Sequence, residues 1–173
     1  MTDAAAPPSA RPAAFGDLEN ELKTTRRVLE RVPDEHWAWK PHEKSMSLGR
    51  LAAHLAELTH LAVTVVQREA FDVATDRPDR PPPANREEVL AIFDQGAALL
   101  VVAVNGAGAD AWRQTWELKA GGQVFMSLPR AAALRVMGIS HPIHHRGQLS
   151  VYLRLLGVPV PSIYGPTADE SFG

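Results

Sequence analysis

The chain has 173 residues, a mass of 18.8 kDa and a net charge of −2, with 45% apolar and 22% charged residues. This composition is that of about one ordinary globular domain, and the balanced charge argues against nucleic acid or an anionic membrane as a partner. Cysteine is absent, which excludes disulfides, a catalytic thiol and thiolate ligands to a metal.

The start of the chain is rich in alanine and proline, and it predicts a disordered lead-in over residues 1–12. A single domain is expected to follow over residues 13–173. The start lacks the basic and apolar pattern of a secretory signal. The longest apolar run, Ala97 to Val104, is far shorter than the roughly 20 residues that cross a bilayer. We therefore expect a cytoplasmic protein with no membrane partner.

Helical spacing of apolar residues predicts the first two helices. The first pattern runs from Phe15 to Val32, and Pro33 ends it. Ser47 is the expected N-cap of the second helix, which should extend to about Phe71. A proline-rich loop follows and separates this helix from the next.

The middle of the chain predicts a third helix and then a change of period. Asn85 and Glu88 have the spacing of a capping box, and the helix that they begin should end near Val104. Residues 112–118 partly alternate, and after a glycine turn residues 124–126 are apolar. This pattern predicts a short β-hairpin.

The fourth helical pattern is the longest, from about Pro129 to Leu156, with Gly157 as its C-cap. Pro142 lies inside it and predicts a kink at the turn that carries His141. The tail after this helix is expected to be irregular and packed on the surface. The predicted fold class is all-α: a four-helix up-down bundle with a possible short β-hairpin between the third and fourth helices.

Three histidines form the strongest candidate site. His141 and His145 are four residues apart on the fourth helix, so they lie about 40° apart around its axis. His54 replaces an apolar residue in the inward stripe of the second helix. A shared metal ion would provide partners for these imidazoles, and three nitrogens with open remaining positions are typical of a catalytic metal site. His144 is an alternative to His145 in this pattern.

Other interpretations of these histidines remain open. His54 can instead be a core histidine bonded to a carbonyl or to a side chain such as Gln148. His60 lies beside Glu57 on another face and is expected to be solvated.

The remaining candidates are single residues near the histidines. Gln148 and Tyr152 continue the His141/His145 face and suit the positioning of a ligand or a substrate. Arg146 is a candidate for binding an anionic group, with a salt bridge as the alternative. Glu57, one turn from His54, is a candidate general base. Five aromatic residues can line a pocket or a lid, with simple packing as the alternative: Trp37, Trp39, Trp112, Trp116 and Tyr164.

Two stretches resemble the DinB superfamily, a damage-inducible family of helical bundles distinct from the DNA polymerase of that name. They are WAWKPHEKSMSLGRLAAHLAEL (Trp37–Leu58) and HPIHHRGQLSVYLRLLGVPVPSIYGP (His141–Pro166). The resemblance implies a four-helix bundle that often forms homodimers. It also implies one divalent metal ion held by His54, His141 and His145. Zinc or nickel is expected first, with iron, manganese and copper as alternatives.

The resemblance leaves the reaction open. Some relatives transfer or isomerise substrates with low-molecular-weight thiols, and others are presumed hydrolases. We therefore expect a metal-dependent thiol transferase or hydrolase that acts on a small-molecule substrate. The alternative is a non-enzymatic, stress-related dimer that binds a metal or another ligand. Nucleic-acid binding is not expected from the charge.

Overall fold

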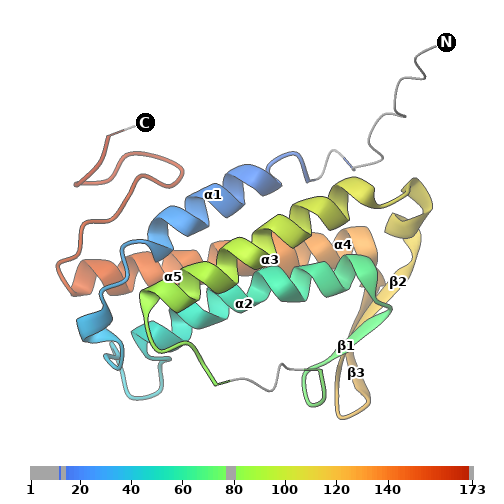
Figure 1. The fold of residues 1–173 in the computed structure, drawn as a ribbon, viewed down its shortest axis with the longest axis horizontal. Coiled ribbons are helices and arrows are strands. Elements are labelled where there is room, and N and C mark those ends of the chain that lie inside the picture. The colour runs from blue at the N-terminus through green and yellow to red at the C-terminus, as the bar shows by residue number, and fades with distance from the viewer. Residues whose placement is uncertain (1–11, 13–14, 77–80, 172–173) are drawn as a thin grey trace.

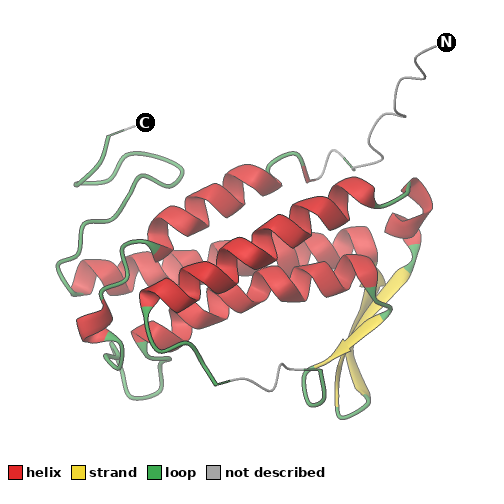
Figure 2. Cartoon of the chain, in the orientation of Figure 1, coloured by secondary structure: helices red, strands yellow, loops and turns green. Residues whose placement is uncertain are grey.

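The computed structural model describes residues 12, 15–76 and 81–171, and its helices form one elongated bundle (Figures 1 and 2). The first three helices of this bundle are α1 (Leu18–Leu29), α2 (Leu48–Gln67) and α3 (Arg86–Gly106). The fourth is broken into α4 (Arg130–Leu134), a π-helical segment (Arg135–Ser140) and α5 (His141–Leu155). Short 3₁₀ turns precede α2 and follow α3, over Asp34–His36 and Ala109–Arg113. Except for Pro12, the predicted lead-in lies outside the described residues.

The order of the helices around the bundle differs from a simple up-down arrangement. Both α1 and α2 pack against α3 and against α5, and the main neighbours of α1 do not include α2. The consecutive helices α1 and α2 therefore lie at opposite corners of the bundle. A long connector between these two helices allows this arrangement, whereas a tight turn would have kept them side by side.

The predicted caps are present. The Ser47 hydroxyl accepts a hydrogen bond from the Arg50 backbone N–H at 3.2 Å, so α2 begins where the sequence indicates. The Asn85 side chain accepts from the Glu88 N–H at 2.9 Å at the start of α3. The Glu88 carboxylate accepts from the preceding Ala84 N–H at 2.9 Å and from the Asn85 side-chain amide at 3.3 Å, whereas in a standard capping box it would accept from the Asn85 backbone N–H. At the other end of the bundle, Gly157 adopts a φ of +72°, which ends α5 as a C-cap glycine.

The second helix ends earlier than predicted because its last expected residues form a strand. Phe71 lies in β1 (Ala70–Asp72), which pairs parallel with β2 (Thr115–Ala120). β2 pairs antiparallel with β3 (Gln123–Pro129), which gives a three-stranded sheet of order β1–β2–β3. The turn between β2 and β3 has two glycines with positive φ, and both donate backbone N–H groups to the Asp72 carboxylate. The Ala74 N–H, which also donates to this carboxylate, and the two glycine N–H groups lower the pKa of Asp72. The glycine bonds attach the turn to the end of β1.

The break in the fourth helix lies directly before the predicted histidine turn. The segment Arg135–Ser140 is π-helical, so its hydrogen bonds run to the fifth residue along the chain. The π-helical hydrogen bonds end with the bond from the His141 N–H to the Val136 carbonyl, and Pro142, which has no N–H, cannot continue them. The disturbance expected from Pro142 is thus a change of helix type immediately before it.

Two clusters of buried apolar residues run along the bundle, and α2 contributes to both. Trp112 and Trp116 belong to the first cluster, so they are core residues rather than the lining of a pocket. By length and composition, α3 could cross a membrane. In the structure α3 packs against α1 and α2 as a bundle helix, and 33% of its most apolar stretch is buried.

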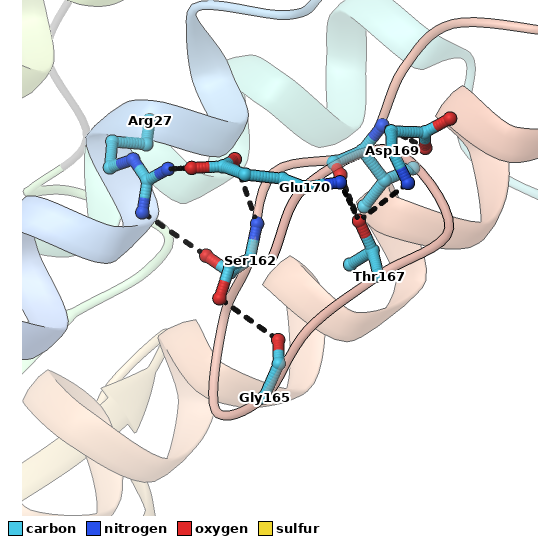
Figure 3. A network of polar contacts seen from close by, with 7 residues as sticks. Arg27, Ser162, Gly165, Thr167, Asp169 and Glu170 are labelled. Atoms are coloured by element: carbon cyan, nitrogen blue, oxygen red, sulfur yellow. Dashed lines mark hydrogen bonds and ion pairs between the residues drawn. The ribbon is translucent and has the colours of Figure 1, made fainter. Parts of the chain in front are cut away.

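The tail after α5 is irregular in the described residues and is held on the surface by polar contacts (Figure 3). Glu170 pairs with Arg27 of α1 and accepts the Ser162 backbone N–H at 3.0 Å. Asp169 accepts the Val160 N–H at 2.9 Å. This confirms the predicted packing of the tail, and it fixes the tail across α1 and α5.

Candidate metal centre

His54 lies on the half-exposed edge of α2, at its border with α5. Half-buried residues recur along this edge of α2 at a spacing of three or four, and most of the residues between them in the sequence are buried. The members of this edge are Arg50, His54, Glu57, Leu61 and Thr64. His54 therefore faces neither the centre of the core nor open water, and its ring lies 4.6 Å from the ring of His145 and 5.3 Å from that of His141.

The two α5 histidines face His54 and each other. Their Nε2 atoms are 2.8 Å apart, as the i, i+4 spacing allows. In His54, His141 and His145, one ligand nitrogen from each ring lies within 4.8 Å of the other two. His144 is exposed, and it lies outside this group although its ring is 4.9 Å from that of His145. The geometry thus favours His145 over His144 as the third member.

Gln148 determines which nitrogen of His145 is available. Its side-chain oxygen lies 2.7 Å from His145 Nδ1, and an amide oxygen can only accept a hydrogen bond. The Nδ1 atom therefore carries the proton, and Nε2 keeps its lone pair on the side of His141. A partner of this kind orients most metal-binding histidines in proteins.

The surroundings keep the rings of His141 and His145 neutral. Burial, together with the neighbouring His145 and His144, lowers the pKa of His141 from 6.5 to about 4. Burial also lowers the pKa of His145, against the opposing effect of its bond to Gln148. Neutral imidazole is the form that binds a metal ion, so the rings of His141 and His145 are in the ligand form at neutral pH.

The lowered pKa of His141 predicts a pH dependence of stability in the metal-free protein. Between pH 6.5 and 4 the unfolded chain binds more protons at His141 than the folded chain does, so the free energy of unfolding falls as the pH falls. We expect a loss on the order of 2 kcal/mol over this range, because solvent at a half-buried ring weakens the full effect. Urea unfolding at several pH values measures it. The His141→Gln variant should lose most of this slope, and identical pH profiles of the two proteins would contradict the prediction.

The other predicted candidates occupy different places. Arg146 is only 1% exposed and faces α1, where its Nη2 atom lies 2.8 Å from a Glu21 carboxylate oxygen. Its Nη1 atom donates to the Thr25 hydroxyl, so the salt-bridge alternative is the one observed. The Tyr152 hydroxyl donates to the Met46 carbonyl at 3.3 Å, and its ring meets Trp39 edge-on.

Three further predictions are resolved by packing. His60 is not solvated: it is half-buried, and its Nε2 atom lies 3.0 Å from the Ile92 carbonyl of α3. Trp37 packs against Gly49, where an added Cβ would lie 2.2 Å from the indole. The Tyr164 hydroxyl donates to Glu21, and its ring lies over the Arg146 guanidinium. Trp37 thus fastens the connector to the bundle and Tyr164 fastens the tail, whereas His60 joins α2 to α3.

Sequence reasoning missed the partner of Glu57. Arg50 Nη1 lies 3.0 Å from the Glu57 carboxylate, and the two residues stand on either side of His54 along α2. Residues seven apart lie on one line of a helix, so the spacing in the sequence carried the signal. A small hollow of about 10 Å³, roughly the space of one water molecule, lies elsewhere in the described part of the bundle, and its lining includes Leu55 and Thr59 but none of the three histidines.

Comparison with sequence models of protein families identifies one family. The sequence model of the DinB family matches residues 13–171. An uncharacterized protein of Bacillus subtilis (strain 168), YrdA, is 29% identical over 154 residues, which cover 88% of this chain and 86% of that protein.

Two solved structures share the fold. A DinB-like protein from Bacillus cereus ATCC 10987 has a TM-score of 0.69 at 20% identity, over 87% of this chain and 95% of that one. A DinB-like protein from Bacillus subtilis, YjoA, has a TM-score of 0.67 at 18% identity, over 86% of this chain and 96% of that one.

Proposed function

The chain belongs to the DinB family, and on this premise we propose that it is a metal-dependent enzyme that acts on a small molecule. The observation that carries the proposal is the convergence of His54, His141 and His145, whose ligand nitrogens lie within 4.8 Å of one another. Three protein nitrogens leave coordination positions for a further ligand, which is the arrangement of catalytic rather than structural zinc sites.

The donor set fits one divalent ion. Three neutral imidazoles suit zinc or nickel, and iron, copper and manganese are the alternatives. The lowered pKa values of His141 and His145 favour the ligand form of both rings, and Gln148 fixes the tautomer of His145. A divalent ion held there would lower the pKa of a bound thiol or water and so supply a nucleophile near neutral pH.

The chain's own residues then have separate roles. The three histidines hold the metal, and Gln148 orients His145. Tyr152, held by Met46, adds an aromatic ring on the same face of α5. Because the chain has no cysteine, a thiol in the reaction must come from a cosubstrate. Transfer of a low-molecular-weight thiol to an electrophile is our first choice of reaction, and hydrolysis is the second.

A non-enzymatic role is the second candidate. The ligands come from both α2 and α5, so a bound metal would join two helices and stabilise the fold by linkage. In either role we propose a cytoplasmic homodimer with a function in stress. Exposed apolar residues on α5, Val151 and Leu155, support a self-association surface.

The test compares metal-free protein with protein reloaded with zinc or nickel after purification without a nickel column. Two reactions are followed: substitution of the chloride of 1-chloro-2,4-dinitrobenzene by the thiol of cysteine, and hydrolysis of p-nitrophenyl acetate. We expect the loaded protein to accelerate one of them at least about 100-fold over the metal-free protein. A raised melting temperature with no acceleration of either reaction would instead support the non-enzymatic role.

A further inference from the structure

A charged pair borders the three-histidine group on α2. Arg50 and Glu57 are joined at 3.0 Å, and their side chains are 41% and 36% exposed. Both lie on the half-exposed edge of α2 that also carries His54. Arg50 precedes His54 by one helical turn, and Glu57 follows it by almost one turn.

The side chains of Arg50 and Glu57 meet across the turn of α2 that carries His54. Helical side chains lean toward the N-terminus, so Glu57 leans back toward the turn of His54 while Arg50 extends forward to meet it. Residues four apart on a helix have Cβ atoms about 6 Å apart, which places the stem of Arg50 next to the His54 ring. From this spacing and the 41% exposure of the Arg50 side chain, we infer that the guanidinium lies on the solvent side of His54.

We propose that Arg50 binds a carboxylate group of the small molecule that takes the open position of the metal. This inference rests on the proposed function, because it assumes a metal held by the three histidines. The planar guanidinium matches a carboxylate with two parallel hydrogen bonds, and its present partner is itself a carboxylate. The substrate or cosubstrate class is thus a small carboxylic acid whose second functional group, such as a thiol, reaches the metal.

Glu57 acts in this proposal as an exchangeable partner. A pair as exposed as this one contributes little to stability, so a ligand carboxylate can replace Glu57 at low cost. Arg146 cannot serve the same purpose, because it is 1% exposed and paired with Glu21 on the α1 side. The proposal therefore predicts opposite effects at the two ends of the pair: removing Arg50 weakens binding of a carboxylate ligand, and removing Glu57 strengthens it.

The experiment uses the full chain loaded with cobalt, whose visible absorption changes when a thiol binds the metal. The dissociation constants of 3-mercaptopropionate and of 2-mercaptoethanol, its uncharged analogue, are measured in wild type, Arg50→Gln and Glu57→Gln. Relative to wild type, Arg50→Gln should weaken the binding of 3-mercaptopropionate roughly five- to tenfold, and Glu57→Gln should strengthen its binding severalfold. Binding of 2-mercaptoethanol should stay the same in all three proteins.

A matched control separates this effect from general loss of charge. Arg26→Gln removes an arginine of equal exposure, 41%, which is paired with Glu30 and Asp94 away from the histidines. It should leave both constants unchanged. The proposal is overturned if Arg50→Gln does not change the ratio of the dissociation constants of the two thiols. It is also overturned if Arg50→Gln and Glu57→Gln weaken the binding of 3-mercaptopropionate alike. Failure of cobalt to bind, or of either thiol to change its spectrum, contradicts the proposed function itself.

Discussion

The His54→Ala variant is expected to bind zinc or nickel at least about 100-fold more weakly than the wild-type protein. His54 is the one member of the three-histidine group that comes from α2. Without it, His141 and His145 remain as two ligands on one helix, and a spacing of four residues alone does not make a high-affinity site. The lost ligand also removes the link between α2 and α5 that a bound metal would make.

Elemental analysis of protein purified without a nickel column, followed by titration against a chelator, measures this loss. His60→Ala is the matched control, because His60 lies on the same helix but faces Ile92 of α3. His144→Ala is the control on α5, and both should keep about one equivalent of metal. Gln148→Ala should weaken binding about tenfold, since it only orients His145. A full equivalent of metal in His54→Ala would show that the site lies elsewhere.

Arg146→Met should lower the free energy of unfolding by about 3 kcal/mol. The guanidinium of Arg146 is 1% exposed, and methionine of similar length leaves Glu21 as a carboxylate without its cation at 12% exposure. The variant also removes the donor to Thr25 and the cation beneath the Tyr164 ring. Three elements, α1, α5 and the tail, lose a common anchor.

Denaturant unfolding measures the effect, with Arg113→Met as the control. Arg113 is 84% exposed and pairs with Asp110, which is 94% exposed, so its loss should change stability by less than about 0.5 kcal/mol. The metal content of folded Arg146→Met should equal that of wild type. If the free energy of unfolding were unchanged and an anionic ligand bound more weakly, the result would instead support Arg146 as an anion-binding residue.

Local signals in the sequence were sufficient for the start of the helices and for much of the site. Ser47 and Asn85 cap α2 and α3 as predicted, because a cap depends on atoms only three residues away. The family and its helical fold were recognisable from the same sequence. Helical phase placed His141 and His145 on one face, and the family resemblance implied His54 as the third member. Phase alone put His54 in the inward stripe of α2, whereas it lies on the half-exposed edge of that helix.

Contacts between segments far apart in the sequence could not be predicted from these local signals. Phase alone does not say which helix faces which, so Arg146 could not be assigned to α1, nor His60 to α3. Phe71 continues an apolar helical pattern, yet it forms a strand because β2, more than forty residues later, offers a pairing edge. The place of α1 opposite α2 likewise depends on the whole bundle.

The π-helical segment Arg135–Ser140 rotates the side-chain faces of α5 relative to those of α4 about their common helix axis. A π turn holds one residue more than an α turn, and one residue corresponds to about 100° of rotation. The apolar face of α4 and the histidine face of α5 are therefore set independently, although the chain runs through both. Shortening this segment by a single residue would turn His141 and His145 away from α2 while leaving the core contacts of α4 in place, so the alignment of the site depends on a length and not on any one side chain.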